Sequence, residues 1–278
     1  MRKTSWHDLL RPGEATDFFS RGTFPPFDPS ASGYNAGNAL WLMELSRLVY
    51  RHDIEEENAP PQPTRVSFLV KAGLKQRRFF LSRKTGTQAM LVESADGPSF
   101  AVLAFRGTEQ EIKDFLTDLE VGIQQLSHDS PGVHEGFEEA IDSVWSDVEA
   151  ELAKLSCPVY YTGHSLGAAL ATLAAARQRP AALYTFGSPR VGNALFAASF
   201  ANLPVHRVVD DKDAVAHLPP RLMGFEHVGE LHLLKQRGGW YGRSLIAWAR
   251  RFFGHPPKEL ADHAPVNYLD RIMKQVSG

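Results

Sequence analysis

Cysteine is almost absent from this chain of 278 residues, which contains only Cys157. An intrachain disulfide is therefore excluded. Because Cys157 directly precedes a strand-like segment, we expect it to be a small buried hydrophobe rather than a nucleophile. Long hydrophobic runs are missing too, since no segment approaches the roughly 18 apolar residues that a membrane span needs. The sequence therefore predicts a soluble protein.

Neither positive nor negative charge is in large excess. The chain has 30 Lys and Arg against 32 Asp and Glu, which gives a formal net charge of -2. A general nucleic-acid binder needs a basic surface, so we expect no nucleic-acid partner. No spacing typical of metal ligands appears either, and we expect neither a metal nor an organic cofactor.

The basic N-terminus, Met1–Asp8, is not followed by an apolar stretch. A secretion signal requires one, so the default expectation is a cytoplasmic protein, with export as the alternative. The length suits a single α/β domain over residues 1–278. Within it, residues 1–34 are rich in Pro, Gly and Phe, which predicts an N-terminal arm laid over the domain.

Strand-like and helix-like segments alternate along most of the chain. Apolar residues recur at helical spacing between Phe137 and Leu155, and a second helix is expected around 193–201. Strands are expected near 79–82, 87–93, 100–105, 158–162, 182–186 and 206–209. This alternation predicts a mostly parallel sheet covered by helices, with its site at the carboxyl ends of the strands.

The most informative motif is Gly163-His164-Ser165-Leu166-Gly167. It lies between a strand-like run and an alanine-rich helical stretch, which is the setting of a serine held on a sharp turn with its hydroxyl exposed. Glycine suits both outer positions because a Cβ would clash where backbone segments come this close. The motif predicts that Ser165 is the nucleophile of a hydrolase. It also predicts that the backbone N–H of Leu166, at the start of the following helix, helps to bind an oxyanion.

A serine nucleophile needs a histidine base and a carboxylate that orients it, and on this fold they follow the serine as acid and then histidine. Asp210, Asp211 and Asp213 all follow a strand, and the chemistry of the sequence does not choose among them. The candidate histidines are His206, His217, His227, His232, His255 and His263. Of these, His263 stands where an exposed loop enters the last helix.

Several blocks together resemble the class 3 lipases, the family that includes the filamentous-fungal triacylglycerol lipases. The blocks are Ala104–Thr108, His134–Phe137, Gly163–Ala168, Thr185–Gly192, Val208–Val215 and, more weakly, Asp262-His263 with Tyr268. The family implies the α/β-hydrolase fold, with Asp213 as the acid and His263 as the base. Asp210 and Asp211 then become surface or turn residues, and His164 a structural one.

The resemblance also implies that Thr108 supplies the second oxyanion donor. A competing role for its hydroxyl is to cap a helix, because Thr108 and Glu111 form a Thr-x-x-Glu capping box. The family places an amphipathic lid over the site at this position. Residues 108–120 carry a matching apolar stripe of Ile112, Phe115, Leu116 and Leu119. The alternative for this segment is an ordinary surface helix.

Residues 240–254 are basic and aromatic, which is typical of a helix that lies in a lipid interface. A helix packed on the core has a similar pattern and is commoner, and peripheral contact with a membrane or lipid droplet is the alternative. Taken together, the sequence predicts a serine carboxylic-ester hydrolase, a triacylglycerol lipase that acts on lipid or ester substrates at an interface. The alternatives are a phospholipase, a mono- or diacylglycerol lipase or a feruloyl-type esterase, and more distantly a non-catalytic binding protein.

Overall fold

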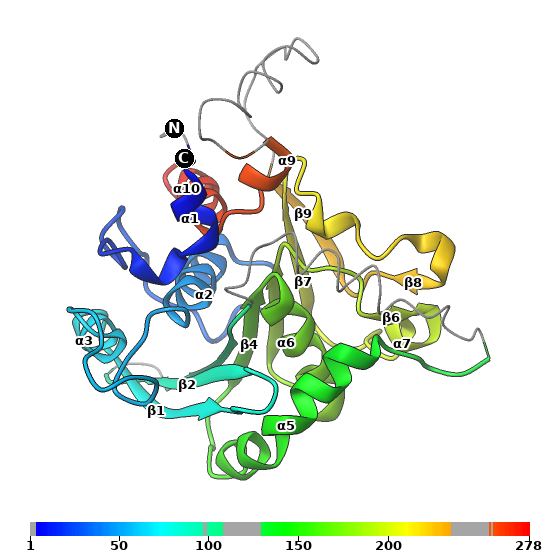
Figure 1. Ribbon diagram of the computed structural model, residues 1–278, viewed down its shortest axis with the longest axis horizontal. Coiled ribbons are helices and arrows are strands. Elements are labelled where there is room, and N and C mark those ends of the chain that lie inside the picture. The colour runs from blue at the N-terminus through cyan, green and yellow to red at the C-terminus, as the bar shows by residue number, and fades with distance from the viewer. Residues whose placement is uncertain (1–3, 97–98, 108–128, 235–255, 257) are drawn as a thin grey trace.

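A seven-stranded sheet runs through the centre of the protein (Figure 1). The computed structural model describes residues 4–96, 99–107, 129–234, 256 and 258–278. The strands lie in the order β1-β2-β3-β4-β5-β7-β9. They span Leu74–Leu81 (β1), Gln88–Ser94 (β2), Ala101–Phe105 (β3), Val159–His164 (β4), Ala182–Phe186 (β5), Val205–Asp210 (β7) and Glu230–Leu234 (β9). Pairing is antiparallel from β1 to β3 and parallel from β3 to β9, so the predicted mostly parallel sheet is present.

Helices cover both faces of this sheet (Figure 1). The α-helices are α1 (Trp6–Leu10), α2 (Ala36–Leu48), α3 (Arg65–Lys71), α5 (Glu135–Leu152), α6 (Leu166–Arg177), α7 (Ala194–Ala198), α9 (Lys258–Ala261) and α10 (Pro265–Val276). Short 3-10 turns lie at Pro12–Glu14, Val215–His217 and Arg221–Met223, and a small second sheet pairs β6 (Gly192–Asn193) with β8 (Phe225–Glu226). Among the described residues, no helix combines the length and apolar character that crossing a bilayer requires.

Two hydrophobic cores lie on opposite faces of the sheet, because alternate residues of each strand point to opposite sides. In β4, Tyr160 belongs to the core that includes residues of α2 and α10, whereas Tyr161 belongs to the core that includes residues of α5 and α6. Burying each large apolar side chain contributes about 1.5–3 kcal/mol, so these two layers hold the sheet rigid. Cys157 packs at the margin of the second core and is partly exposed, so the prediction that it is buried was wrong.

The segment from residue 4 to residue 34 lies along α2 and α10, with α1 beside α10 (Figure 1). Arg21 forms hydrogen bonds to Asp270 of α10 at 2.9 and 3.0 Å. Arg47 of α2 is buried, and it pairs with Glu44 at 2.7 Å and with Asp17 of the segment at 2.8 Å. A buried guanidinium needs such partners, because an unpaired charge away from water is costly. These ion pairs tie the N-terminal segment to both helices.

Candidate active site

Ser165 lies on a strained turn between β4 and α6. Its backbone has φ 59° and ψ -129°, a conformation that a residue with a side chain rarely adopts. The Ser165 N–H donates to the carbonyl of Phe186 at 3.0 Å, which ties the turn to the end of β5. A Cβ on Gly163 would lie 2.2 Å from the carbonyl oxygen of Gly167, and one on Gly167 would lie 2.3 Å from that of Phe105. The strand–turn–helix predicted from the motif is therefore present, and both glycines are required by close approach.

Asp213 and His263 come together although 50 positions separate them along the chain. Asp213 follows β7, and His263 immediately precedes the loop into α10. Nδ1 of His263 lies 2.8 Å from Oδ2 of Asp213, and both side chains are buried. An ionised carboxylate can only accept a hydrogen bond, so Nδ1 of His263 carries the proton. The lone pair of the neutral ring is then on Nε2. This is the tautomer that a general base requires.

Two further donors hold the Asp213 carboxylate. The hydroxyl of Tyr268 donates to Oδ2 at 2.5 Å, and the backbone N–H of Val215 donates to Oδ1 at 2.9 Å. Burial raises the pKa of Tyr268 well above its usual value, and the adjacent Asp213 charge raises it further, so the phenol stays protonated. The Tyr268 hydroxyl in turn accepts the N–H of Asp210 at 3.0 Å. Tyr268 is a positioning residue that the sequence flagged only as part of a weak block.

His164 connects the elbow to the histidine loop. Its Nε2–H donates to the carbonyl oxygen of His263 at 2.7 Å, and the two rings lie 4.5 Å apart. Burial, with the nearby His263 ring as a smaller cause, lowers the pKa of His164 well below its usual value, so this ring is neutral. His164 therefore holds the main chain of His263 next to Ser165. Ser165 Oγ and His263 Nε2 share no hydrogen bond here; such bonds are often long before substrate binds.

The prediction that Asp210 is a surface or turn residue was wrong. Asp210 is fully buried at the end of β7 and forms an ion pair with Arg271 of α10. Arg271 also donates to Asp262 at 2.8 Å, the residue before His263. Asp211 lies in the turn and pairs with Lys258 at 2.5 Å. The buried pairs of Arg271 with Asp210 and Asp262 brace the end of β7, which leads to Asp213, against the segment that carries His263.

Other predicted positions fall away from this cluster or outside the described residues. Leu166 is the first residue of α6, where backbone N–H groups have no partner within the helix. Thr108, the lid segment 108–120 and the segment 240–254 lie outside the described residues, as does His255. The histidines His206, His217, His227 and His232 are described, and none of them forms a hydrogen bond to Asp213.

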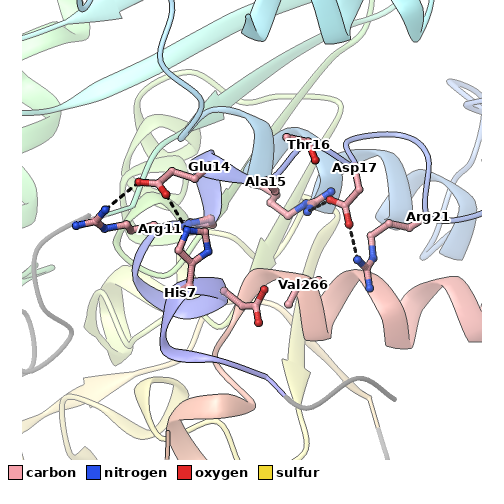
Figure 2. Close-up of a pocket in the computed structure, with 11 residues that line it drawn as sticks. His7, Arg11, Glu14, Ala15, Thr16, Asp17, Arg21 and Val266 are labelled. Carbon is pink, nitrogen blue, oxygen red and sulfur yellow. Dashed lines mark hydrogen bonds and ion pairs between the residues drawn. The ribbon is translucent and has the colours of Figure 1, made fainter. Parts of the chain in front are cut away.

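A cavity of about 190 Å³ lies elsewhere, between the N-terminal segment, α2 and the start of α10 (Figure 2). Its charged side chains face one another. Glu14 accepts from His7 at 2.7 Å and from Arg11 at 3.1 Å, and Asp17 pairs with Arg21 at 2.5 Å. Neither Ser165 nor His263 lines this cavity. Most of its charges are paired within the N-terminal segment, and the Asp17–Arg47 pair joins the segment to α2, so the cavity is separate from the candidate active site.

Gly187 follows β5 and borders the carboxylate–imidazole pair. Its φ of +57° disfavours any side chain, and a Cβ would lie 2.7 Å from Asp213 Oδ2 and 3.0 Å from His263 Nδ1. We expect Gly187→Ala to lower kcat for p-nitrophenyl butyrate by about 100-fold, because a displacement of about 1 Å at reacting groups costs that much. The matched control is Gly86→Ala, which has a similar φ of +70° but open space around its Cβ. Equal kcat in the two variants would contradict this packing argument.

The mostly parallel sheet, the strained elbow after β4 and the Asp213–His263 pair beyond the carboxyl ends of the strands define an α/β-hydrolase. The sequence model of one family, described as Lipase (class 3), matches residues 102–223. The chain belongs to the class 3 lipase family.

Two curated relatives and one solved structure show the extent of the similarity. Secreted mono- and diacylglycerol lipase 1 of Fusarium solani is 44% identical over 108 residues, covering 34% of this chain and 32% of the relative. Secreted mono- and diacylglycerol lipase A of Penicillium cyclopium is 36% identical over 147 residues, covering 47% and 46%. The triacylglyceride lipase of Rhizomucor miehei has a TM-score of 0.53 at 30% identity, covering 58% of this chain and 67% of that one. The chain spans less than half the length of these curated relatives.

The expectation of a cytoplasmic protein was wrong. The relatives from Fusarium solani and Penicillium cyclopium are both named secreted enzymes. The expectation rested on the absence of an apolar stretch after Met1–Asp8. The composition of these eight residues does not determine the compartment in which the enzyme acts.

Proposed function

We propose that this protein is a serine carboxylic-ester hydrolase, a triacylglycerol lipase, with Ser165, His263 and Asp213 as its catalytic residues. The observation that carries the proposal is the 2.8 Å contact between His263 Nδ1 and Asp213 Oδ2, held beside the strained turn of Ser165. Ser165 follows β4, Asp213 follows β7 and His263 lies between α9 and α10, so the residue types that acyl transfer requires come from three separate parts of the fold. Membership of the class 3 lipases supports the same reading.

In the proposed reaction, Ser165 Oγ attacks the ester carbonyl carbon while its proton passes to His263 Nε2. The C–O bond to the alcohol then breaks, and the alcohol leaves with that proton. A water molecule next attacks the acyl-enzyme, giving its proton to His263, and the carboxylic acid leaves as Ser165 recovers its hydroxyl hydrogen. The Asp213 carboxylate stabilises the imidazolium that forms, and hydrogen bonds from the Tyr268 hydroxyl and the Val215 N–H hold that carboxylate in place.

The negative charge on the carbonyl oxygen in the transition state needs donors aimed at it. The Leu166 N–H is proposed as one of them, because the N-terminus of α6 carries partial positive charge and follows Ser165 directly. Thr108 is proposed as the other from the family resemblance. The lid at 108–120, the interfacial helix at 240–254 and the single domain over 1–278 remain predictions from the sequence.

A second candidate, hydrolysis of mono- and diacylglycerols, is favoured by one observation. The relatives from Fusarium solani and Penicillium cyclopium are named for these substrates. Both candidates use the same acyl-transfer residues, and they differ only in the loops that shape the acyl and alcohol pockets. Loops of this kind vary between relatives that share a catalytic site, so the substrate has to be measured.

The test measures acid release at constant pH from emulsified trioleoylglycerol, dioleoylglycerol and monooleoylglycerol, with phosphatidylcholine and ethyl ferulate as further substrates. We expect trioleoylglycerol to be hydrolysed at a rate within about tenfold of dioleoylglycerol, which is the scale of a modest pocket preference. Hydrolysis of the mono- and diesters alone would favour the second candidate. Hydrolysis confined to phosphatidylcholine or ethyl ferulate would replace both with a phospholipase or a feruloyl esterase.

A further inference from the structure

A second cluster of chemically active side chains lies on the outer strands of the sheet, away from Ser165. His206 of β7 stands opposite Glu230 of β9, and His232 is two residues further along β9. Residues two apart on a strand share a face, and so do directly opposed residues on neighbouring strands, so all three side chains project from the same face of the sheet. One ligand atom from each lies within 4.8 Å of the other two.

The spacing of these atoms suits a metal ion. Nδ1 of His206 lies 3.2 Å from Nε2 of His232, and that Nε2 lies 3.7 Å from Oε2 of Glu230. Two nitrogens bound to Zn²⁺ at about 2.0–2.1 Å in a tetrahedron lie about 3.3 Å apart. The two imidazoles therefore already stand at the separation of a zinc pair. Glu230 is largely exposed and free to rotate by the small amount needed to bring its carboxylate closer.

Packing holds the two rings in place. Tyr34 stacks on His232, with ring centroids 4.0 Å apart and planes within 14°. Tyr184 packs against His206 at 4.6 Å. Ligands that are fixed before binding lose little freedom when the metal arrives, which favours affinity. His206 is buried, His232 is mostly buried and Glu230 reaches solvent, so the cluster also has an entry path for an ion.

We propose that His206, His232 and Glu230 bind a divalent transition-metal ion, with Zn²⁺ as the preferred ion and water completing the coordination. Two imidazoles and one carboxylate are ligands that Zn²⁺ accepts, whereas Ca²⁺ and Mg²⁺ prefer oxygen alone. The ion would join β9, the outer strand of the described sheet, to β7, which leads to Asp213. The site is independent of the proposed ester hydrolysis, and its role is to stabilise this part of the fold.

The competing explanation for the 3.2 Å contact is a plain hydrogen bond between the two histidines. Calorimetric titration of the tag-free protein with ZnCl₂, after EDTA has removed any bound metal, distinguishes this hydrogen bond from a metal site. We expect binding of one equivalent, and Co²⁺ at the same site should give the intense visible absorption of tetrahedral cobalt. Saturation at about a hundred times Kd should raise Tm by about 5 °C.

Glu230→Gln is the informative variant, because the exposed side chain keeps its shape and the fold is not at risk. We expect it and His232→Ala to weaken Zn²⁺ binding by more than the roughly 10- to 100-fold that loss of an outer-shell partner costs. The matched control is His7→Ala, which removes a histidine that pairs with Glu14 but belongs to no group of three possible metal ligands in the described part of the chain. Absence of stoichiometric binding, or unchanged binding in Glu230→Gln and His232→Ala, would overturn the proposal.

Discussion

Replacement of Ser165 with alanine is expected to lower kcat for p-nitrophenyl butyrate by about 10⁶-fold, to the background set by binding and oxyanion stabilisation alone. The reason is that no other atom at the elbow can form the acyl-enzyme once Oγ is removed. The fold should be unaffected, because the turn is fixed by its backbone, with the Ser165 N–H bonded to the Phe186 carbonyl and the two glycines closely packed. Initial rates and circular dichroism on the same preparation measure both quantities.

The control for this variant is Ser199→Ala. Ser199 caps the end of α7, where its hydroxyl donates to the carbonyl of Phe196 at 2.7 Å, and it takes no part in the candidate active site. It should therefore keep wild-type kcat. Turnover by folded Ser165→Ala protein within tenfold of the wild type would refute the assignment of the nucleophile.

The second large effect is expected for Asp213→Asn, which should lower kcat by about 10⁴-fold with little change in KM. An amide in place of the carboxylate turns an N–H group toward His263 or Tyr268, and it allows the imidazole to carry its proton on Nε2. A ring protonated there cannot accept the proton of Ser165. Steady-state kinetics with a short-chain ester separates the kcat effect from any change in substrate binding.

Asp211→Asn is the matched control, because it makes the same chemical change two residues away. Asp211 is partly exposed and pairs with Lys258, so its loss should leave kcat within a few-fold of the wild type. Surface pairs of this kind contribute about 0–1 kcal/mol to stability. Equal losses in the two variants would show that the effect is structural rather than a property of the Asp213–His263 contact.

The sheet could be predicted from the sequence where strands are apolar. The strand expected at 182–186 coincides with β5, in which every residue is buried. The outer strand β1 begins at Leu74, ahead of the expected start near Phe79. The polar residues in its first half are exposed or half-buried. Its backbone pairing with β2 holds it in the sheet, and a side-chain pattern does not report that pairing.

The site could be predicted only in part, because several of its contacts join residues that are far apart in the chain. The elbow is local, so its glycines and strand–helix context were visible in the sequence itself. The choice of Asp213 over Asp210 needed the family resemblance, because all three aspartates lie at or just after the end of the same strand. Asp210 was misassigned because its partner Arg271 comes from the last helix, and the residues near Asp210 in the chain do not predict that contact. The contact of the Tyr268 hydroxyl with Asp213 could not be predicted for the same reason, because the two residues are 55 positions apart in the chain.

The central claim is that Asp213 and His263 activate Ser165. Labelling with a fluorophosphonate probe tests it most directly, because only an activated serine should react. Peptide mass mapping is expected to place a single label on Ser165 in the wild type, with labelling at least tenfold slower in folded His263→Ala protein. Labelling at another serine, or equal labelling of Ser165 in the wild type and in His263→Ala, would contradict the account.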